Sequence, residues 1–183
     1  MSDQATITLS DLVVTTFTKG LNTLTHVLQV AEAHAATQGI NPDTEYLPAR
    51  LIDDMRPLQF QLQNVTKHVR VVLGRLTGEE YPVWEDTETT IKEFYGRIEK
   101  ARKLLEGVDK SKIDARAGEV VDHPFGPNIT FKVSIRDSIF GHGLPNFYFH
   151  LTTAYAILRS KGVPVGKYDY VKEFFAPVEI PRR

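Results

Sequence analysis

Apolar residues recur at steps of three and four along three stretches of the chain, which is the spacing that puts them on one face of a helix. The first stretch covers about residues 10–37 and stops at Gly39. The second covers 57–77, has the most regular pattern and stops at Gly78. The third covers 87–106. The pattern therefore predicts three amphipathic helices of similar length.

Residues with short polar side chains mark where these helices should begin. Ser10 is the expected N-cap of the first helix, and Asp86 or Thr87 that of the third. Such side chains accept hydrogen bonds from backbone N–H groups of the first turn, which have no partner inside the helix.

A fourth helix is expected over residues 134–160. Ser134 and Asp137 form a pair similar to a capping box at its start. Two glycines and a proline between residues 141 and 145 predict a kink or short break near this end.

The segment 120–133 differs from the rest, because residues alternate on both sides of a turn-forming run at 124–128. This predicts a β-hairpin. The remaining tail, 163–183, is rich in aromatic residues and is expected to fold back on the body. Together the segments predict an all-α fold: one domain over residues 1–183, an antiparallel four-helix bundle with a small hairpin inserted before the last helix.

Composition excludes several classes of function. The 183 residues are 42% hydrophobic and 25% charged, and 22 Lys and Arg against 23 Asp and Glu give a net charge of −1. Proteins that bind nucleic acid or anionic membranes need a basic excess, so neither partner is expected. The chain has no cysteine, which excludes disulfides, thiolate nucleophiles and cysteine-bound metals. With neither a signal peptide nor a membrane span in the sequence, we expect a cytoplasmic protein.

Polar side chains interrupt the apolar face of the fourth helix. At 100° per residue, Asn146, His150 and Thr153 lie on one stripe, with Phe147 at its edge. A polar group buried without a partner costs about 1–3 kcal/mol, so these groups need each other, a water, a metal or a ligand.

The second helix carries Gln61 and His68 two turns apart on one edge of its apolar face, and Asn64 lies further out. His142 precedes Asn146 by one turn, while His123 has no partner that the pattern identifies. One such histidine alone is more often a satisfied core residue than a ligand. Taken together, the polar residues of the two helices predict a functional site. The expected catalytic residues are His150, Asn146, His68 and Gln61. The expected ligand-binding residues are Thr153, Phe147, Asn64 and His142.

Three segments carry a resemblance to a known family: DDMRPLQFQLQNVTKHVRVVLGRLTG, WEDTETTIKEF and LPNFYFHLTTAYAILRSKGVPVGK. The chain resembles an uncharacterised family, a domain of unknown function, within the DinB/YfiT-like superfamily of four-helix bundles. The resemblance implies metalloenzymes with three histidine ligands, one on the second helix and an H-x-x-x-H pair on the last. Here the pair reads Asn146-x-x-x-His150. The resemblance also implies transferases and isomerases in which the metal activates the thiol of an external cofactor.

Three hypotheses follow for the function. The first is a small-molecule enzyme without a metal, in which His150 is the general acid/base of an isomerase, cyclase or lyase and no cofactor is required. The second is a metal-dependent, thiol transferase-like enzyme with a weak site for Zn, Ni or Mn at His150 and His68.

The third hypothesis is a dimeric bundle that binds a ligand without catalysis. It rests on a second apolar stripe on the fourth helix, made of Tyr148, Leu151, Tyr155 and Leu158. A helix that is apolar on two faces needs two packing partners. The aromatic tail or a second subunit could provide the outer one, and we expect a homodimer.

Overall fold

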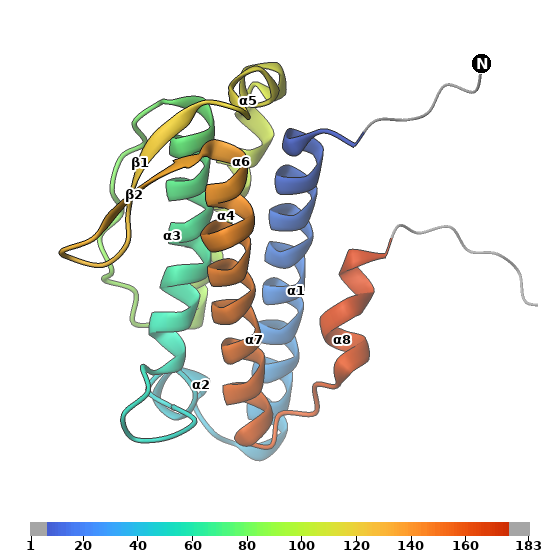
Figure 1. Cartoon of the computed structure of the whole chain (residues 1–183). Helices are drawn as coiled ribbons and strands as arrows, with labels where there is room; N and C mark the ends of the chain where they lie inside the picture. Colours follow the sequence, from blue (N-terminus) through green and yellow to red (C-terminus); the bar gives the residue numbers. More distant parts are fainter. Residues whose placement is uncertain (1–6, 176–183) are drawn as a thin grey trace, which may run out of the picture.

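Four long helices form the body of the computed structural model, which describes residues 7–175 (Figure 1). They are α1 (Leu9–Gln38), α3 (Leu58–Thr77), α4 (Ile91–Gly107) and α7 (Leu144–Ser160). The shorter helices are α2 (Pro42–Glu45), α5 (Lys110–Arg116), α6 (Ile135–Ser138) and α8 (Lys167–Val171). Strands β1 (Val120–Pro124) and β2 (Thr130–Ser134) pair antiparallel beside α3. The expected all-α bundle with a hairpin before the last helix is confirmed.

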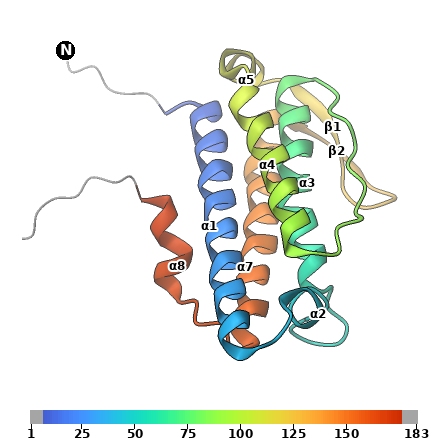
Figure 2. The same cartoon turned by 180° about the vertical axis from the view of Figure 1, so that it is seen from behind.

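The core lies where the apolar faces of the four helices meet. Each of α1 and α3 packs against both α4 and α7, as Figures 1 and 2 show from opposite sides. The repeating apolar positions of α1 and α3 are fully buried, including Phe17, Leu24, Leu62 and Val69. Burial of these faces stabilises the fold, because each large apolar side chain removed from water contributes about 1.5–3 kcal/mol.

The segment 78–90 decides the directions of the helices. It runs back along the outside of the bundle, so that α4 begins near the end at which α3 also begins (Figure 2). The backbone N–H of Ile91 donates to Asp43 of α2, 2.7 Å away, at that end. As a result α3 and α4 run parallel to each other, whereas α3 and α7 run antiparallel.

The C-terminal ends of α1 and α3 lie where the glycines predict them, whereas the N-caps differ from the predicted residues. Gly39 and Gly78 adopt positive φ angles of 66° and 72° and end α1 and α3 as expected. The N-cap of α1 is Thr8 and not Ser10, because the Ser10 hydroxyl donates instead to Asp114 of α5 at 2.7 Å.

Helix α4 begins at Ile91 and not at residue 87. Thr90 and Glu93 form a reciprocal capping box there. Asp86 does not cap the helix, since its carboxylate pairs with Arg97 at 2.7 Å.

The break expected between residues 141 and 145 is a π-helical turn, Ile139–Gly143, between α6 and α7. Ser134 caps α6 by accepting a hydrogen bond of 3.0 Å from the backbone N–H of Asp137. A π-turn inserts an extra residue into the helical repeat and is frequent at functional sites. Here it lies against the hairpin and turns His142 toward it.

The part of the aromatic tail that the structure describes packs against α1, as expected. Helix α8 is followed by a 3₁₀ turn, Lys172–Phe174, and both contact α1. Thr23 donates to the backbone carbonyl of Tyr170, and His26 contacts Asp169 at 2.9 Å. Residues 176–183 of the tail lie outside the described residues. Over 7–175, no helix combines the length and apolar character that crossing a membrane requires.

Candidate functional site

His150 and Gln61 meet across the interface of α7 and α3. The amide Nε2 of Gln61 donates to the backbone carbonyl of Arg56 at 3.0 Å, so its Oε1 faces His150. The distance from Oε1 to His150 Nδ1 is 2.8 Å. Because Oε1 can only accept, Nδ1 of His150 carries the proton and Nε2 keeps its lone pair.

His68, two turns after Gln61 on α3, is held in the same tautomer. Its Nδ1 lies 2.8 Å from the backbone carbonyl oxygen of Asn64, which is also only an acceptor. Nε2 of His68 therefore also keeps a free lone pair. The ring centroids of His68 and His150 are 5.3 Å apart. Two imidazoles on neighbouring helices thus each offer a hydrogen-bond acceptor that could also bind a metal.

Two further histidines extend this pair toward the hairpin. The ring of His142, on the π-turn, lies 6.2 Å from that of His68. The ring of His123, on β1, lies 4.7 Å from that of His142 in an edge-to-face arrangement. His150, His68, His142 and His123 form a line of four imidazoles along one flank of the bundle, which we call the histidine line.

Burial keeps the imidazoles of the histidine line neutral at neutral pH. It lowers the pKa of His150 to about 4, with further contributions from His68 and Lys67. Burial is also the main cause that lowers the pKa of His68, of His142 and of His123, and the charge of Arg75 acts in the same direction on all three. The unprotonated form is favoured because a buried imidazolium loses its hydration.

The other residues predicted for the site do not all lie beside His150. Asn146 lies one turn before His150, and its Nδ2 donates to the backbone carbonyl of His142 at 2.9 Å. Thr153 lines a separate pocket of about 500 Å³ between α7 and Leu51 and Met55. Phe147 is fully buried against Phe17 of α1, at 4.5 Å between ring centroids, and is not brought to the site.

Sequence reasoning left His123 without a partner, but in the structure it belongs to the histidine line. The register of the hairpin pairs His123 with Phe131 and places both beside the π-turn. The alternation of the strand could have indicated that His123 faces inward, but not that it meets His142. His26, equally unassigned, contacts Asp169 of α8.

The metal site of the resemblance requires three histidines, and the residues present do not complete it. Asn146 occupies the first position of the H-x-x-x-H pair. Within residues 7–175, nowhere do three or more His, Asp or Glu side chains gather as a potential metal site. His150 and His68 remain as two nitrogen donors, fewer than the three protein ligands usual in catalytic zinc sites.

Comparison with known proteins gives a matching family model and similar solved structures. The model of a family described as "Domain of unknown function (DUF1993)" matches residues 9–171. The crystal structure of a DinB family member protein from Shewanella denitrificans is 35% identical in sequence, with a TM-score of 0.84. That match covers 94% of this chain and 96% of the other. None of the curated proteins compared with the sequence matches it.

Proposed function

The chain belongs to the DUF1993 family, an uncharacterised DinB-like family, and from its site we propose a function. We propose that it is a small-molecule enzyme in which His150 acts as a general base without a metal. The observation that carries the proposal is the fixed tautomer of His150. Gln61 holds Nδ1–H at 2.8 Å, which leaves the Nε2 lone pair in one orientation. Gln61 is therefore a positioning residue, because both ends of its amide are already used inside the protein.

Of the isomerase, cyclase and lyase reactions of this class, an isomerisation needs only one group that accepts a proton and returns it, which a single imidazole can do. At neutral pH the imidazole is unprotonated and can accept a proton from a carbon next to a carbonyl group. The C–H bond breaks, an N–H bond forms at Nε2, and the electron pair moves into an enolate. The imidazolium formed is a stronger acid than it would be in water, because its pKa is lowered, and it returns the proton to another carbon of the enolate.

Asn146 is suited to bind the enolate oxygen. It lies one turn from His150 on α7, and residues four apart are neighbours on a helix. One amide hydrogen of Nδ2 serves the carbonyl of His142, and the second is available for a substrate oxygen. His68 adds a second neutral acceptor beside His150. The proposed substrate is thus a small cytoplasmic carbonyl compound with an acidic C–H bond.

Exchange of carbon-bound hydrogen tests this proposal without a known product. Small ketones and 1,3-dicarbonyl compounds are incubated with the protein in D₂O, and loss of their C–H signals is followed by NMR. The wild-type protein should accelerate the exchange, and His150→Gln should reduce it by about 100-fold or more. The rate should be constant between pH 6 and 8, because His150 is already unprotonated there. Exchange that His150→Gln leaves unchanged, or the lack of any catalysed exchange, would reject the mechanism.

A second candidate is a weak divalent-metal site at His150 and His68, with zinc, nickel or manganese as the ion and thiol-transferase chemistry. The favouring observation is that both rings bind carbonyl oxygens through Nδ1, as metal-bound histidines commonly do. Metal analysis of protein purified without a histidine tag tests it. Stoichiometric metal that is lost in His68→Gln would support this candidate, whereas trace metal and no thermal shift with the three ions would reject it.

A further inference from the structure

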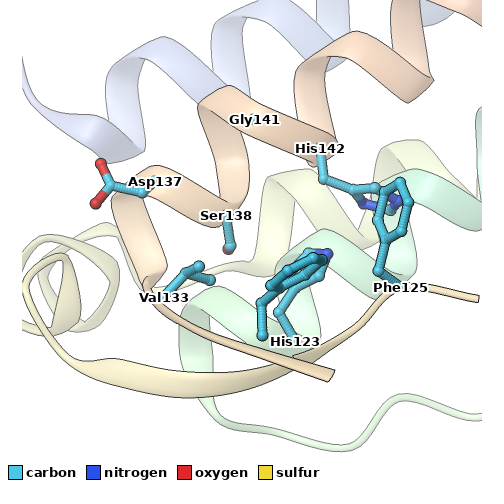
Figure 3. A pocket seen from close by; sticks show the side chains of 8 residues that line it. His123, Phe125, Val133, Asp137, Ser138, Gly141 and His142 are labelled. Atoms are coloured by element: carbon cyan, nitrogen blue, oxygen red, sulfur yellow. The ribbon is translucent and has the colours of Figure 1, made fainter. Parts of the chain in front are cut away.

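A pocket of about 190 Å³ lies between the hairpin and the π-turn (Figure 3). Its walls are mostly apolar and include Phe125, Phe131 and Val133. The rings of His123, His142 and Phe125 gather at one end, away from Asp137 (Figure 3). A cavity of about 150 Å³ is enough to bind benzene, so this pocket has the size for one aromatic ring.

His123 is the unusual residue of this pocket. Its side chain is only 3% exposed, and within the described part of the chain neither ring nitrogen has a hydrogen-bond partner. A neutral imidazole has one N–H donor and one acceptor, and leaving such groups buried and unpaired costs free energy. Both nitrogens are closed to water, so a small rotation of the ring would bring one of them to the pocket, where the polar edge of a ligand would satisfy it.

The remaining walls determine the shape and charge of that ligand. The ring of Phe125 lies 5.9 Å from Phe131 and 5.7 Å from His142 in edge-to-face contact, so the three rings form one aromatic wall against which a flat ligand can pack. The positive charge of Arg75 acts on both His123 and His142 and disfavours a cation. The carboxylate of Asp137 in the lining disfavours an anion.

We propose that this pocket binds a single uncharged aromatic ring that carries a hydroxyl or ring N–H group, a phenol or an azole, with its polar edge on His123. The ligand ring packs against the aromatic wall that Phe125, Phe131 and His142 form, and His123 selects ligands that hydrogen-bond. This site does not depend on the catalytic role proposed for His150, because it uses other side chains and its occupation is measured by binding.

Titration with phenol, followed by the ¹H–¹⁵N spectrum of the backbone and of the histidine rings, tests the proposal. Phenol should shift the ring signals of His123 and His142, and it should bind at least tenfold more tightly than toluene, which has the same ring and no hydroxyl. Benzoate, which is anionic, should bind more weakly than phenol. Equal binding of phenol and toluene, or no shift at His123 at millimolar phenol, would overturn the proposal.

Two variants and a matched control distinguish the contribution of the apolar pocket from that of the hydrogen bond to His123. His123→Phe keeps an aromatic ring and should weaken phenol at least tenfold while leaving toluene unchanged. Gly141→Leu places a side chain where a Cβ meets no neighbour within 4 Å, in the lining of the pocket, and should abolish binding of both compounds. Gly96→Leu on α4, also free of neighbours within 4 Å, should leave both unchanged. Unchanged phenol binding in His123→Phe or in Gly141→Leu would contradict the assignment.

Discussion

A histidine that loses its hydration on folding stays neutral to a lower pH than it does in water, and four side chains of the histidine line share this condition. In each, burial is the largest cause of the lowered pKa. The four histidines differ in which ring nitrogens are engaged in hydrogen bonds. His150 and His68 have their tautomers fixed by acceptors, whereas neither nitrogen of His123 has a hydrogen-bond partner among residues 7–175.

The first prediction concerns the dependence of stability on pH. An unfolded histidine has a pKa near 6.5, so below that pH the unfolded chain binds more protons than the native protein. The free energy of unfolding should therefore be constant above pH 6.5 and fall as the pH is lowered toward 4. His150 alone contributes about 3 kcal/mol to this fall, since one pKa unit corresponds to 1.36 kcal/mol. Urea unfolding at a series of pH values measures it, and His150→Gln should flatten the curve. An equally steep curve in the variant would contradict the low pKa.

At the residue scale, the sequence was informative wherever one helix supplies the geometry. The wheel of α7 placed His150 and Asn146 on one stripe, and that of α3 placed Gln61 and His68 on one edge. The structure joins the two helices by the bond between Gln61 and His150. Phe147 shows the limit of this reasoning, because a residue at the edge of a stripe can face either neighbour. Here it faces α1, where a Cβ on Gly20 would overlap its ring.

Among the elements, the path of the segment 78–90 is the hardest to predict from the sequence pattern. It has no regular structure of its own, and its position depends on Arg97 of α4, which is 3% exposed. The guanidinium pairs with Asp86 at 2.7 Å and with Glu88 at 2.8 Å, and it donates to Thr66 of α3 at 2.8 Å. These contacts link residues far apart in sequence. The periodicity of α4 could not show them, and for the same reason it did not show that Asp86 is unavailable as a cap.

The second prediction follows from this buried ion pair. Arg97→Ala should lower the free energy of unfolding by about 3–5 kcal/mol, because it leaves the carboxylate of Glu88, whose side chain is only 13% exposed, without its counter-charge. Arg97→Lys should recover only part of the loss, since an ammonium group cannot reproduce the forked contacts of a guanidinium. Urea unfolding gives both values. Arg136→Ala is the control: its contact with Asp137 is exposed, so its loss should change stability by less than about 1 kcal/mol. Similar losses in Arg97→Ala and the control would show that the segment 78–90 is held by other contacts.

For the whole molecule, the second apolar stripe of α7 has a partner within the chain. Leu151 and Leu158 are fully buried, whereas Tyr148 and Tyr155 pack against Phe174 and Tyr170 of the tail, at 6.1 and 5.6 Å between ring centroids. Of the two partners considered from the sequence, the tail therefore covers this stripe. The homodimer stays a prediction, and it would need a different surface. The fold class could be predicted because four helical patterns and one hairpin have few ways to pack.

The third prediction tests whether α8 protects this stripe. A chain that ends at Gly166 loses Tyr170 and Phe174, and with them the hydrogen bond from Thr23 of α1. Its free energy of unfolding should fall by about 2 kcal/mol or more, because the apolar surface that the half-buried Tyr170 and Phe174 share with α1 and α7 becomes exposed. Its exposed stripe should also promote association, so light scattering should give a higher average mass than for the full chain at the same concentration. A chain that ends at Phe175 keeps α8 and the 3₁₀ turn and is the matched control, with the higher stability and the lower average mass of the two shortened chains. If the chain ending at Gly166 matched this control in both measurements, the contacts of α8 would contribute neither to stability nor to shielding the tyrosines of α7.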